Sequence, residues 1–343
     1  MSKTKIEWCL RPGTKPEVWN PTTGCNKVSR GCKNCYAEVM HRRLMAMKPE
    51  KYSQPFLNGA VPHPPSLLIP LSWKTPRTVF VNSMSDLFHD EIPFDFIAQV
   101  WCVMKACPQH TFIILTKRPE NMLQFLTQKA VYKKLDDAYL QMMKDGINLP
   151  SSVAYLQKNN TVLFNWPLQN VWLGISDEGN QHQRINILRQ CPAAIKIVSF
   201  EPLICNPGEV DLTGINGVYV GGESGHQATP MHPDWATAIL EQCRKYKTSF
   251  FFKQWGEWLP FEETAQAPFY RDCSDNEEYD AHGLNFYDAE TDEPGKFSGC
   301  NWFDPMDAFI LNGGCNQSVM YLKTGKLKAG RKFYGKEYNE QPA

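Results

Sequence analysis

Three cysteines in the first part of the chain have the spacing of a metal-cluster ligand set. Cys25, Cys32 and Cys35 form a C-x6-C-x2-C pattern on a stretch that we expect to be a loop entering a helix. Cysteine thiolates are the usual protein ligands of iron–sulfur clusters. Three of them can hold three corners of a [4Fe–4S] cube and leave the fourth iron open to a small molecule. The spacing therefore predicts a [4Fe–4S] cluster with one open iron.

Two other interpretations of these cysteines stay open. A structural zinc ion needs four ligands, and Cys9 is available as the fourth. A group of thiols that only pack together is the other alternative. The chain has 12 cysteines in 343 residues, which is too few for a disulfide scaffold. The first residues also lack a secretion signal, so we expect a cytoplasmic protein, in the host cytoplasm if a phage encodes it.

Short apolar runs predict the strands that must position this chemistry. Each run is rich in Val, Ile or Phe and ends in polar or glycine-rich residues, which is typical of parallel strands buried on both faces. Helical patterns at Pro93–Cys107, Asn180–Gln190 and Pro233–Tyr246 lie between the runs. This alternation predicts an α/β fold, a barrel or an open sheet, with right-handed crossovers. The runs are Thr78–Asn82, Thr111–Thr116, Asn170–Ile175, Lys196–Phe200, Gly217–Val220 and Ser249–Lys253.

Polar residues follow the predicted strands at their carboxyl ends, where α/β barrels carry their chemistry. Lys117 and Arg118 can bind a carboxylate or a phosphate, or can form a surface ion pair. Glu201 and Glu223 are candidates for proton transfer or substrate contact. Trp255 can stack on a base or pack in the core. We predict Lys117, Glu201 and Glu223 as catalytic residues.

Several sequence blocks occur in order along nearly the whole chain. They are Ile6–Trp8 (IEW), Trp19–Cys25 (WNPTTGC), Gly31–Glu38 (GCKNCYAE), Ser83–His89 (SMSDLFH), Leu115–Glu120 (LTKRPE), Ser199–Leu203 (SFEPL), Gly221–Gly225 (GGESG), Phe251–Gly256 (FFKQWG) and a terminal GK-x3-GR. Together they resemble the radical S-adenosylmethionine (SAM) enzymes, and in particular the phage-type three-Cys-motif proteins related to them. The usual radical SAM spacing is C-x3-C-x2-C, and this chain departs from it by having six residues in the first gap.

This resemblance implies an α/β fold of the partial (β/α) barrel type, with the cluster in the loop after the first strand. SAM would bind the open iron, and the reduced cluster would cleave it to methionine and a 5′-deoxyadenosyl radical. Tyr36 would lie near the adenine or pack in its helix, and Asp86 would accept from the SAM amino group or cap the next helix. The implied metal ligands are Cys25, Cys32 and Cys35, and the implied SAM-binding residues are Tyr36, Ser83, Ser85, Asp86, Ser176 and Glu178.

The chain is expected to divide near residue 258. Residues 1–258 would form the barrel, with a polar insertion near 132–161, and residues 259–343 would form an irregular C-terminal region with a basic tail. Whether Cys273, Cys300 and Cys315 hold a second cluster in that region stays open.

The resulting functional prediction is a radical SAM enzyme of the isomerase or lyase type that modifies a nucleotide or nucleobase, as in phage DNA base hypermodification. The expected electron donor is a reductase or a flavodoxin-like protein. The alternatives are a DNA-lesion repair lyase similar to spore photoproduct lyase and a non-catalytic, zinc-stabilised nucleic-acid-binding module. With 36 basic and 36 acidic residues the chain is not polycationic, so a contact with nucleic acid requires a local basic patch. No apolar run is long enough for a membrane span.

Overall fold

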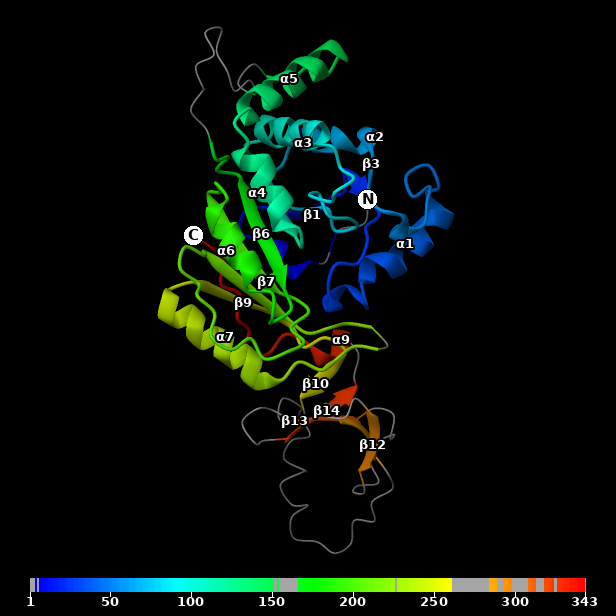
Figure 1. The fold of residues 1–343 in the computed structure, drawn as a ribbon, viewed down its shortest axis with the longest axis vertical. Coiled ribbons are helices and arrows are strands. Elements are labelled where there is room, and N and C mark those ends of the chain that lie inside the picture. Colours follow the sequence, from blue (N-terminus) through cyan, green and yellow to red (C-terminus); the bar gives the residue numbers. More distant parts are fainter. Residues whose placement is uncertain are drawn as a thin grey trace, which may run out of the picture. The chain divides into compact units, whose positions relative to one another are not determined.

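The computed structural model describes residues 4, 6–150, 153, 166–225, 227–260 and 326–342, together with the backbone of four strands between residues 284 and 323. The fold is mixed α/β. A curled, parallel sheet of seven strands forms a half-barrel, with the strand order β1-β4-β5-β6-β7-β8-β9 (Figure 1). This confirms the predicted α/β class and is consistent with a partial (β/α) barrel.

Six of the seven strands coincide with the predicted apolar runs to within two residues. The strand that the runs do not predict is β1 (Lys15–Trp19), whose sequence KPEVW has only two large apolar side chains. It pairs in parallel with β4, where Trp19 lies opposite Val81. The buried Trp19 indole donates to the Ser66 carbonyl over 2.8 Å. The other strands are β4 (Arg77–Val81), β5 (Thr111–Thr116), β6 (Val171–Asp177), β7 (Ile195–Phe200), β8 (Gly217–Gly221) and β9 (Ser249–Gln254).

The three predicted helices are present: α7 (Pro233–Tyr246) has the predicted bounds, whereas α3 (Phe94–Ala106) and α6 (Gln183–Gln190) are slightly shorter than predicted. The predicted insertion begins with a helix, α5 (Val131–Lys144), and residues 154–161 of that insertion lie outside the described residues. The remaining α-helices are α1 (Tyr36–Met47), α2 (Pro64–Leu67), α4 (Pro119–Thr127) and α9 (Lys326–Ala329), and short 3-10 turns lie at Glu7–Cys9, Arg30–Cys32, Phe56–Asn58 and Ile69–Ser72.

Three small sheets accompany the half-barrel. An antiparallel pair joins β2 (Thr22–Thr23) to β3 (Val61–Pro62) beside the cysteines. In the C-terminal region the strand order is β10-β14-β13, and β11 pairs with β12. These strands are β10 (Trp258–Pro260), β11 (Leu284–Asp288), β12 (Glu293–Phe297), β13 (Ala308–Asn312) and β14 (Ser318–Lys323).

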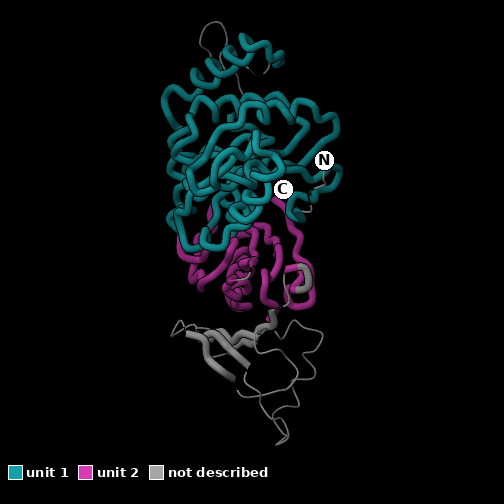
Figure 2. Tube along the Cα trace, turned by 90° about the vertical axis from the view of Figure 1, so that its right-hand side faces the viewer, with its two compact units in different colours: residues 1–176, 182–199, 214–217 teal, residues 177–181, 200–213, 218–343 magenta. Residues whose placement is uncertain are grey.

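The chain forms two compact units (Figure 2). Unit 1 comprises residues 1–176, 182–199 and 214–217, and unit 2 comprises residues 177–181, 200–213 and 218–343. This division differs from the expected boundary near residue 258, because the end of the chain packs back on β9. There the Phe333 ring is fully buried and stacks on Phe252, with ring centroids 5.1 Å apart.

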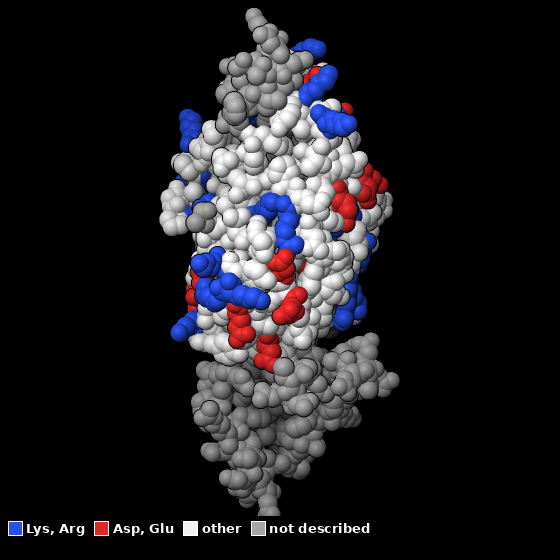
Figure 3. Space-filling view, turned by 60° about the vertical axis from the view of Figure 1, so that its left-hand side comes forward, with Lys and Arg blue, Asp and Glu red and all other residues white. Residues whose placement is uncertain are grey.

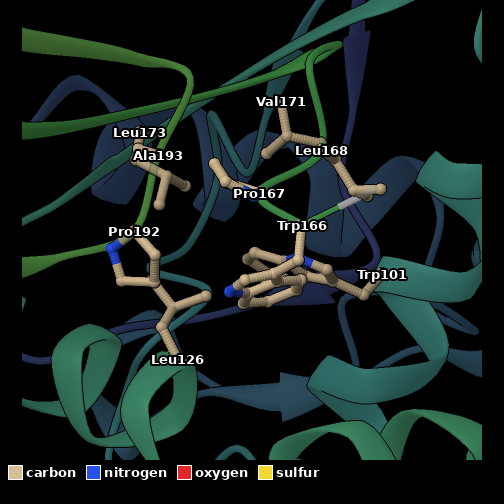
Figure 4. Close-up of a pocket in the computed structure, with 9 residues that line it drawn as sticks. All are labelled: Trp101, Leu126, Trp166, Pro167, Leu168, Val171, Leu173, Pro192 and Ala193. Atoms are coloured by element: carbon tan, nitrogen blue, oxygen red, sulfur yellow. The ribbon is translucent and has the colours of Figure 1, made fainter. Parts of the chain in front are cut away.

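The described residues offer few obvious ligand-binding or catalytic sites, either on the surface or in the interior. Figure 3 shows basic and acidic side chains lying next to one another on one face, in keeping with the net charge of zero. A small cavity in unit 1 is lined by apolar side chains that include Trp101, Leu126 and Trp166 (Figure 4). It has no charged side chain in its lining and therefore offers no chemistry. No described helix is both long and apolar enough to cross a membrane.

Candidate metal centre

The cysteine loop, residues 24–35, runs from β2 to the start of α1. Gly24 begins it with a φ of +82°, and a Cβ there would lie 2.2 Å from the Gly59 carbonyl oxygen, so only glycine fits. The Cys25 amide donates to the Phe56 carbonyl over 2.9 Å. Cys32 ends a 3-10 turn, and Cys35 immediately precedes α1. The loop therefore follows the first strand of the half-barrel, where the resemblance expects the cluster.

The three thiols of the loop are half-buried and differ in acidity. Burial and the Asp86 carboxylate raise the pKa of Cys25 to about 11, against the opposing charge of Arg118. Burial also raises the pKa of Cys35. Burial acts the same way on Cys32, but the Lys117 ammonium and hydrogen bonds with the loop backbone and Ser29 outweigh it, so the pKa of Cys32 is lowered. A metal would have to displace the thiol protons, and the raised pKa values of Cys25 and Cys35 oppose this more than the lowered pKa of Cys32 does.

The three loop thiols are the type of donor that an iron–sulfur cluster uses, and they form no ligand group for a single metal ion. Among the described residues no three His, Cys, Asp or Glu side chains converge as ligands of one metal ion. A tetrahedral zinc site requires such convergence, and Cys9, the expected fourth zinc ligand, joins no such group. A cube presents a separate iron to each thiolate, so its ligands need not meet at one point. The donor set of three half-buried thiols in one loop fits that requirement.

Arg118 connects the end of β5 to the cysteine loop. Its guanidinium is 6% exposed, its Nη1 lies 3.7 Å from Cys25 Sγ, and its Nη2 donates to the side-chain and main-chain oxygens of Asn26. The same Nη1 donates to Asp86 Oδ2 over 3.2 Å. From the sequence, Arg118 was a candidate for binding an anion or for a surface ion pair; it forms an ion pair with Asp86, but a buried one. The role of Asn26 was missed, because no spacing rule distinguishes an asparagine beside a ligand cysteine.

Asp86 is occupied by donors from the protein itself. Besides Arg118, its buried carboxylate accepts from the Thr116 hydroxyl over 2.7 Å and from the amides of Lys117 and Phe88 over 3.0 Å each. The contact with Phe88 is a local turn, and the next helix begins only at Phe94, so Asp86 is not the cap of that helix. Its observed role is to hold Arg118 beside the cysteine loop.

The other residues predicted around SAM in this part of unit 1 tie the loop to the end of β4. The Ser85 hydroxyl donates to the Gly24 carbonyl over 2.7 Å, and the Ser83 hydroxyl donates to Asn20 Oδ1 over 3.2 Å. The Tyr36 hydroxyl donates to the Ser83 carbonyl over 2.6 Å, while the residue remains 57% exposed. The Tyr36 ring is therefore exposed, and its hydroxyl ties the start of the helix to the end of β4. Lys117 also reaches the loop, where its Nζ lies 3.4 Å from Ser29 Oγ.

Unit 2 holds a separate group of polar side chains at the ends of β7, β8 and β9. Glu201 Oε2 pairs with the Lys253 ammonium, and Glu201 Oε1 accepts from Gln254 Nε2 over 3.2 Å. A Cβ at Gly221 would lie 3.0 Å from Glu201 Oε1, so the glycine makes room for the carboxylate. Burial raises the pKa of Glu201, but the ammonium groups of Lys253 and Lys326 outweigh it and the pKa is lowered. The lowered pKa keeps Glu201 charged and makes it a weaker proton acceptor than an unpaired glutamate, so the arrangement favours a contact with the substrate over proton transfer.

The remaining predicted residues have individual surroundings in the two units. Glu223 is buried and accepts from the Thr229 amide over 2.8 Å. Glu178 is buried in unit 2, whereas Ser176 belongs to unit 1, where its carbonyl accepts from Arg184. Trp255 is 1% exposed and packs in the core, which was the alternative to base stacking. Cys273, Cys300 and Cys315 lie outside the described residues.

Comparison with known proteins gives a family but no activity. No curated protein matches the chain, and no solved structure matches it. A family model described as "Protein of unknown function (DUF5131)" matches residues 3–342, which is nearly the whole chain. The chain therefore belongs to the DUF5131 family.

Proposed function

We propose that this chain is a radical SAM enzyme that holds a [4Fe–4S] cluster through Cys25, Cys32 and Cys35. The observation that carries the proposal is the cysteine loop itself, with three half-buried thiols directly after the first strand of an α/β half-barrel. When bound, the reduced cluster supplies the electron that cleaves SAM to methionine and a 5′-deoxyadenosyl radical, which takes a hydrogen atom from the substrate. The protein supplies binding, orientation and shielding for this cofactor chemistry.

The residues around the loop have roles that follow from their contacts. Ser85 and Gly24 hold the start of the loop against the end of β4, and Arg118 holds Cys25 and Asn26 from the end of β5. Tyr36 is the exposed aromatic residue next to the last ligand, where it offers its ring to the adenine. In unit 2 the Glu201 carboxylate, paired with Lys253, is the candidate polar contact for the substrate.

The proposed substrate is a nucleotide or a nucleobase, with modification of phage DNA as the specific form. This part of the proposal rests on the resemblance to phage-type proteins, and a base within a duplex would have to be extruded before its atoms could be reached. The reaction class is a rearrangement or an elimination that begins with hydrogen abstraction. A repair lyase would use the same cofactor chemistry on a damaged base.

The experiment that tests the proposal uses the full chain reconstituted anaerobically with iron and sulfide. Reduced with dithionite in the presence of SAM, it should release 5′-deoxyadenosine, detected by mass spectrometry, and candidate nucleosides or phage DNA should gain a new mass only in the complete mixture. Cys32→Ala should abolish both products, whereas Cys205→Ser, which changes a cysteine outside the loop, should retain them. A reconstituted cluster that yields no 5′-deoxyadenosine would refute the radical chemistry.

A further inference from the structure

Helix α1, directly after the cysteine loop, is apolar on two opposite sides. At about 100° per residue, Val39, Met40, Arg43 and Met47 share one side of the helix. We call these four residues the α1 outer face. Its apolar members are 55%, 41% and 73% exposed in chain order. Figure 1 shows α1 separated from α4, α5 and α6.

The opposite side of α1 already accounts for the attachment of the helix. Ala37 belongs to a buried cluster with Tyr52 and Phe56, and Leu44 is among the side chains packed against that cluster. His41 is also buried and lies edge-on to Tyr52, with ring centroids 5.0 Å apart. The α1 outer face is therefore not needed to anchor the helix. Large apolar side chains that gather on one exposed face, rather than singly, are typical of an interaction surface.

The stretch of chain that contains the α1 outer face is basic, although the net charge of the whole chain is zero. Between residues 24 and 50 the exposed charged residues are six basic side chains and one acidic side chain, Glu50. The other acidic residue in this stretch, Glu38, is already paired with Lys27 at 3.2 Å and with Arg42 at 2.7 Å. The six exposed basic residues are Lys27, Arg30, Lys33, Arg42, Arg43 and Lys48. A complementary partner must carry negative charge around an apolar centre.

We propose that the α1 outer face is the docking surface for an acidic electron-donor protein of the flavodoxin type. Methionine and arginine are enriched in the centres of protein–protein interfaces, whereas interfaces with nucleic acid are more polar. The inference rests on the proposed function, because the donor has a task only if the loop holds a reducible cluster. The donor is oxidised by one electron, which the cluster beside α1 accepts, and no bond or proton is exchanged. Cys35 directly precedes Tyr36, so donor and cluster meet at the same end of the helix.

The test measures binding of a purified flavodoxin to the reconstituted full chain by calorimetry at low and at high salt. Arg43→Glu should weaken binding about tenfold at low salt, because it places like charges opposite each other, and the effect should shrink at high salt. Met47→Ser should weaken binding at both salt concentrations. Leu140→Ser and Lys144→Glu on α5 are matched controls, since Leu140 is 53% exposed and both lie in the same unit, and they should bind like the unchanged chain.

Three results would overturn the docking proposal. One is that flavodoxin does not bind the unchanged chain, and another is that the α1 variants bind it as the α5 variants do. The third is that a single-stranded DNA oligonucleotide, and not flavodoxin, loses affinity in the α1 variants, which would make the face a nucleic-acid surface. Reduction by dithionite distinguishes a failure of the docking proposal from a failure of the proposed function. Chemical reduction should support SAM cleavage equally in all these variants, and its failure in the unchanged chain would refute the enzyme chemistry instead.

Discussion

Arg118 links the buried Asp86 carboxylate to the cysteine loop, and replacing Arg118 should lower the stability of the fold. Arg118→Met leaves Asp86 with three neutral donors and no cation. Removing one partner of a buried ion pair is strongly destabilising. We therefore expect the free energy of unfolding, measured by urea denaturation, to fall by about 3 kcal/mol.

Arg118→Lys is the matched variant for this prediction. A lysine can keep the charge beside Asp86, but it lacks the planar fork that reaches Asn26 and Cys25 at once. We expect it to recover part of the lost stability. If the methionine variant loses less than about 1 kcal/mol, the ion pair is not what holds this part of unit 1 together.

At the scale of elements, the entry into the cysteine loop depends on one glycine. Gly24 and Gly13 both have a positive φ, of +82° and +74°, but only Gly24 has backbone atoms where a Cβ would be placed. Gly13→Ala should therefore cost about 1 kcal/mol for the left-handed conformation alone. Gly24→Ala should cost clearly more and should also lower the iron content after reconstitution. Equal unfolding free energies for the two variants would contradict this account of the loop.

The terminal segment is held on α7 by an ion pair whose strength should depend on pH. Glu340 accepts from Arg244 over 2.6 and 2.9 Å and from the Phe250 amide over 3.1 Å, and these contacts lower its pKa below the usual 4.5. A carboxyl whose folded-state pKa is lowered stabilises the fold above its unfolded pKa, and that stability is lost as the pH falls through the folded pKa.

Glu340→Gln should accordingly lower the unfolding free energy at neutral pH, by at most about 1 kcal/mol because the pair is partly exposed. The difference from the unchanged chain should vanish in acid, once the carboxyl is protonated in both states. Thermal unfolding followed over the acidic range measures this. A difference that stays constant into acid would mean that the carboxylate charge is not responsible.

At the scale of the whole molecule, the sequence predicts the strands of the sheet well. It predicts less well the contacts between segments that are far apart in the sequence. The apolar runs locate β4 to β9 because strands buried on both faces leave continuous hydrophobic sequence. They do not locate β1, whose two apolar side chains give no such run. The return of Phe333 onto Phe252 was not predicted either, since a basic, glycine-containing tail gives no periodic signal.

The same distinction applies to the candidate site. The cysteines were found from spacing alone, because loop ligands lie close together in sequence. The contact between Arg118 and Cys25 joins residues 93 positions apart, and the pair between Lys253 and Glu201 joins residues 52 apart. Both depend on which strands become neighbours in the sheet. Strand order is a tertiary property that local patterns do not encode.

Electron paramagnetic resonance of the dithionite-reduced protein, with and without SAM, tests whether the three cysteines hold a cluster with an iron left for SAM. We expect a signal of a reduced [4Fe–4S] cluster that changes when SAM is added, is absent in Cys32→Ala and persists in Cys205→Ser. Stoichiometric zinc without that signal, or a cluster signal that SAM leaves unchanged, would contradict the proposal.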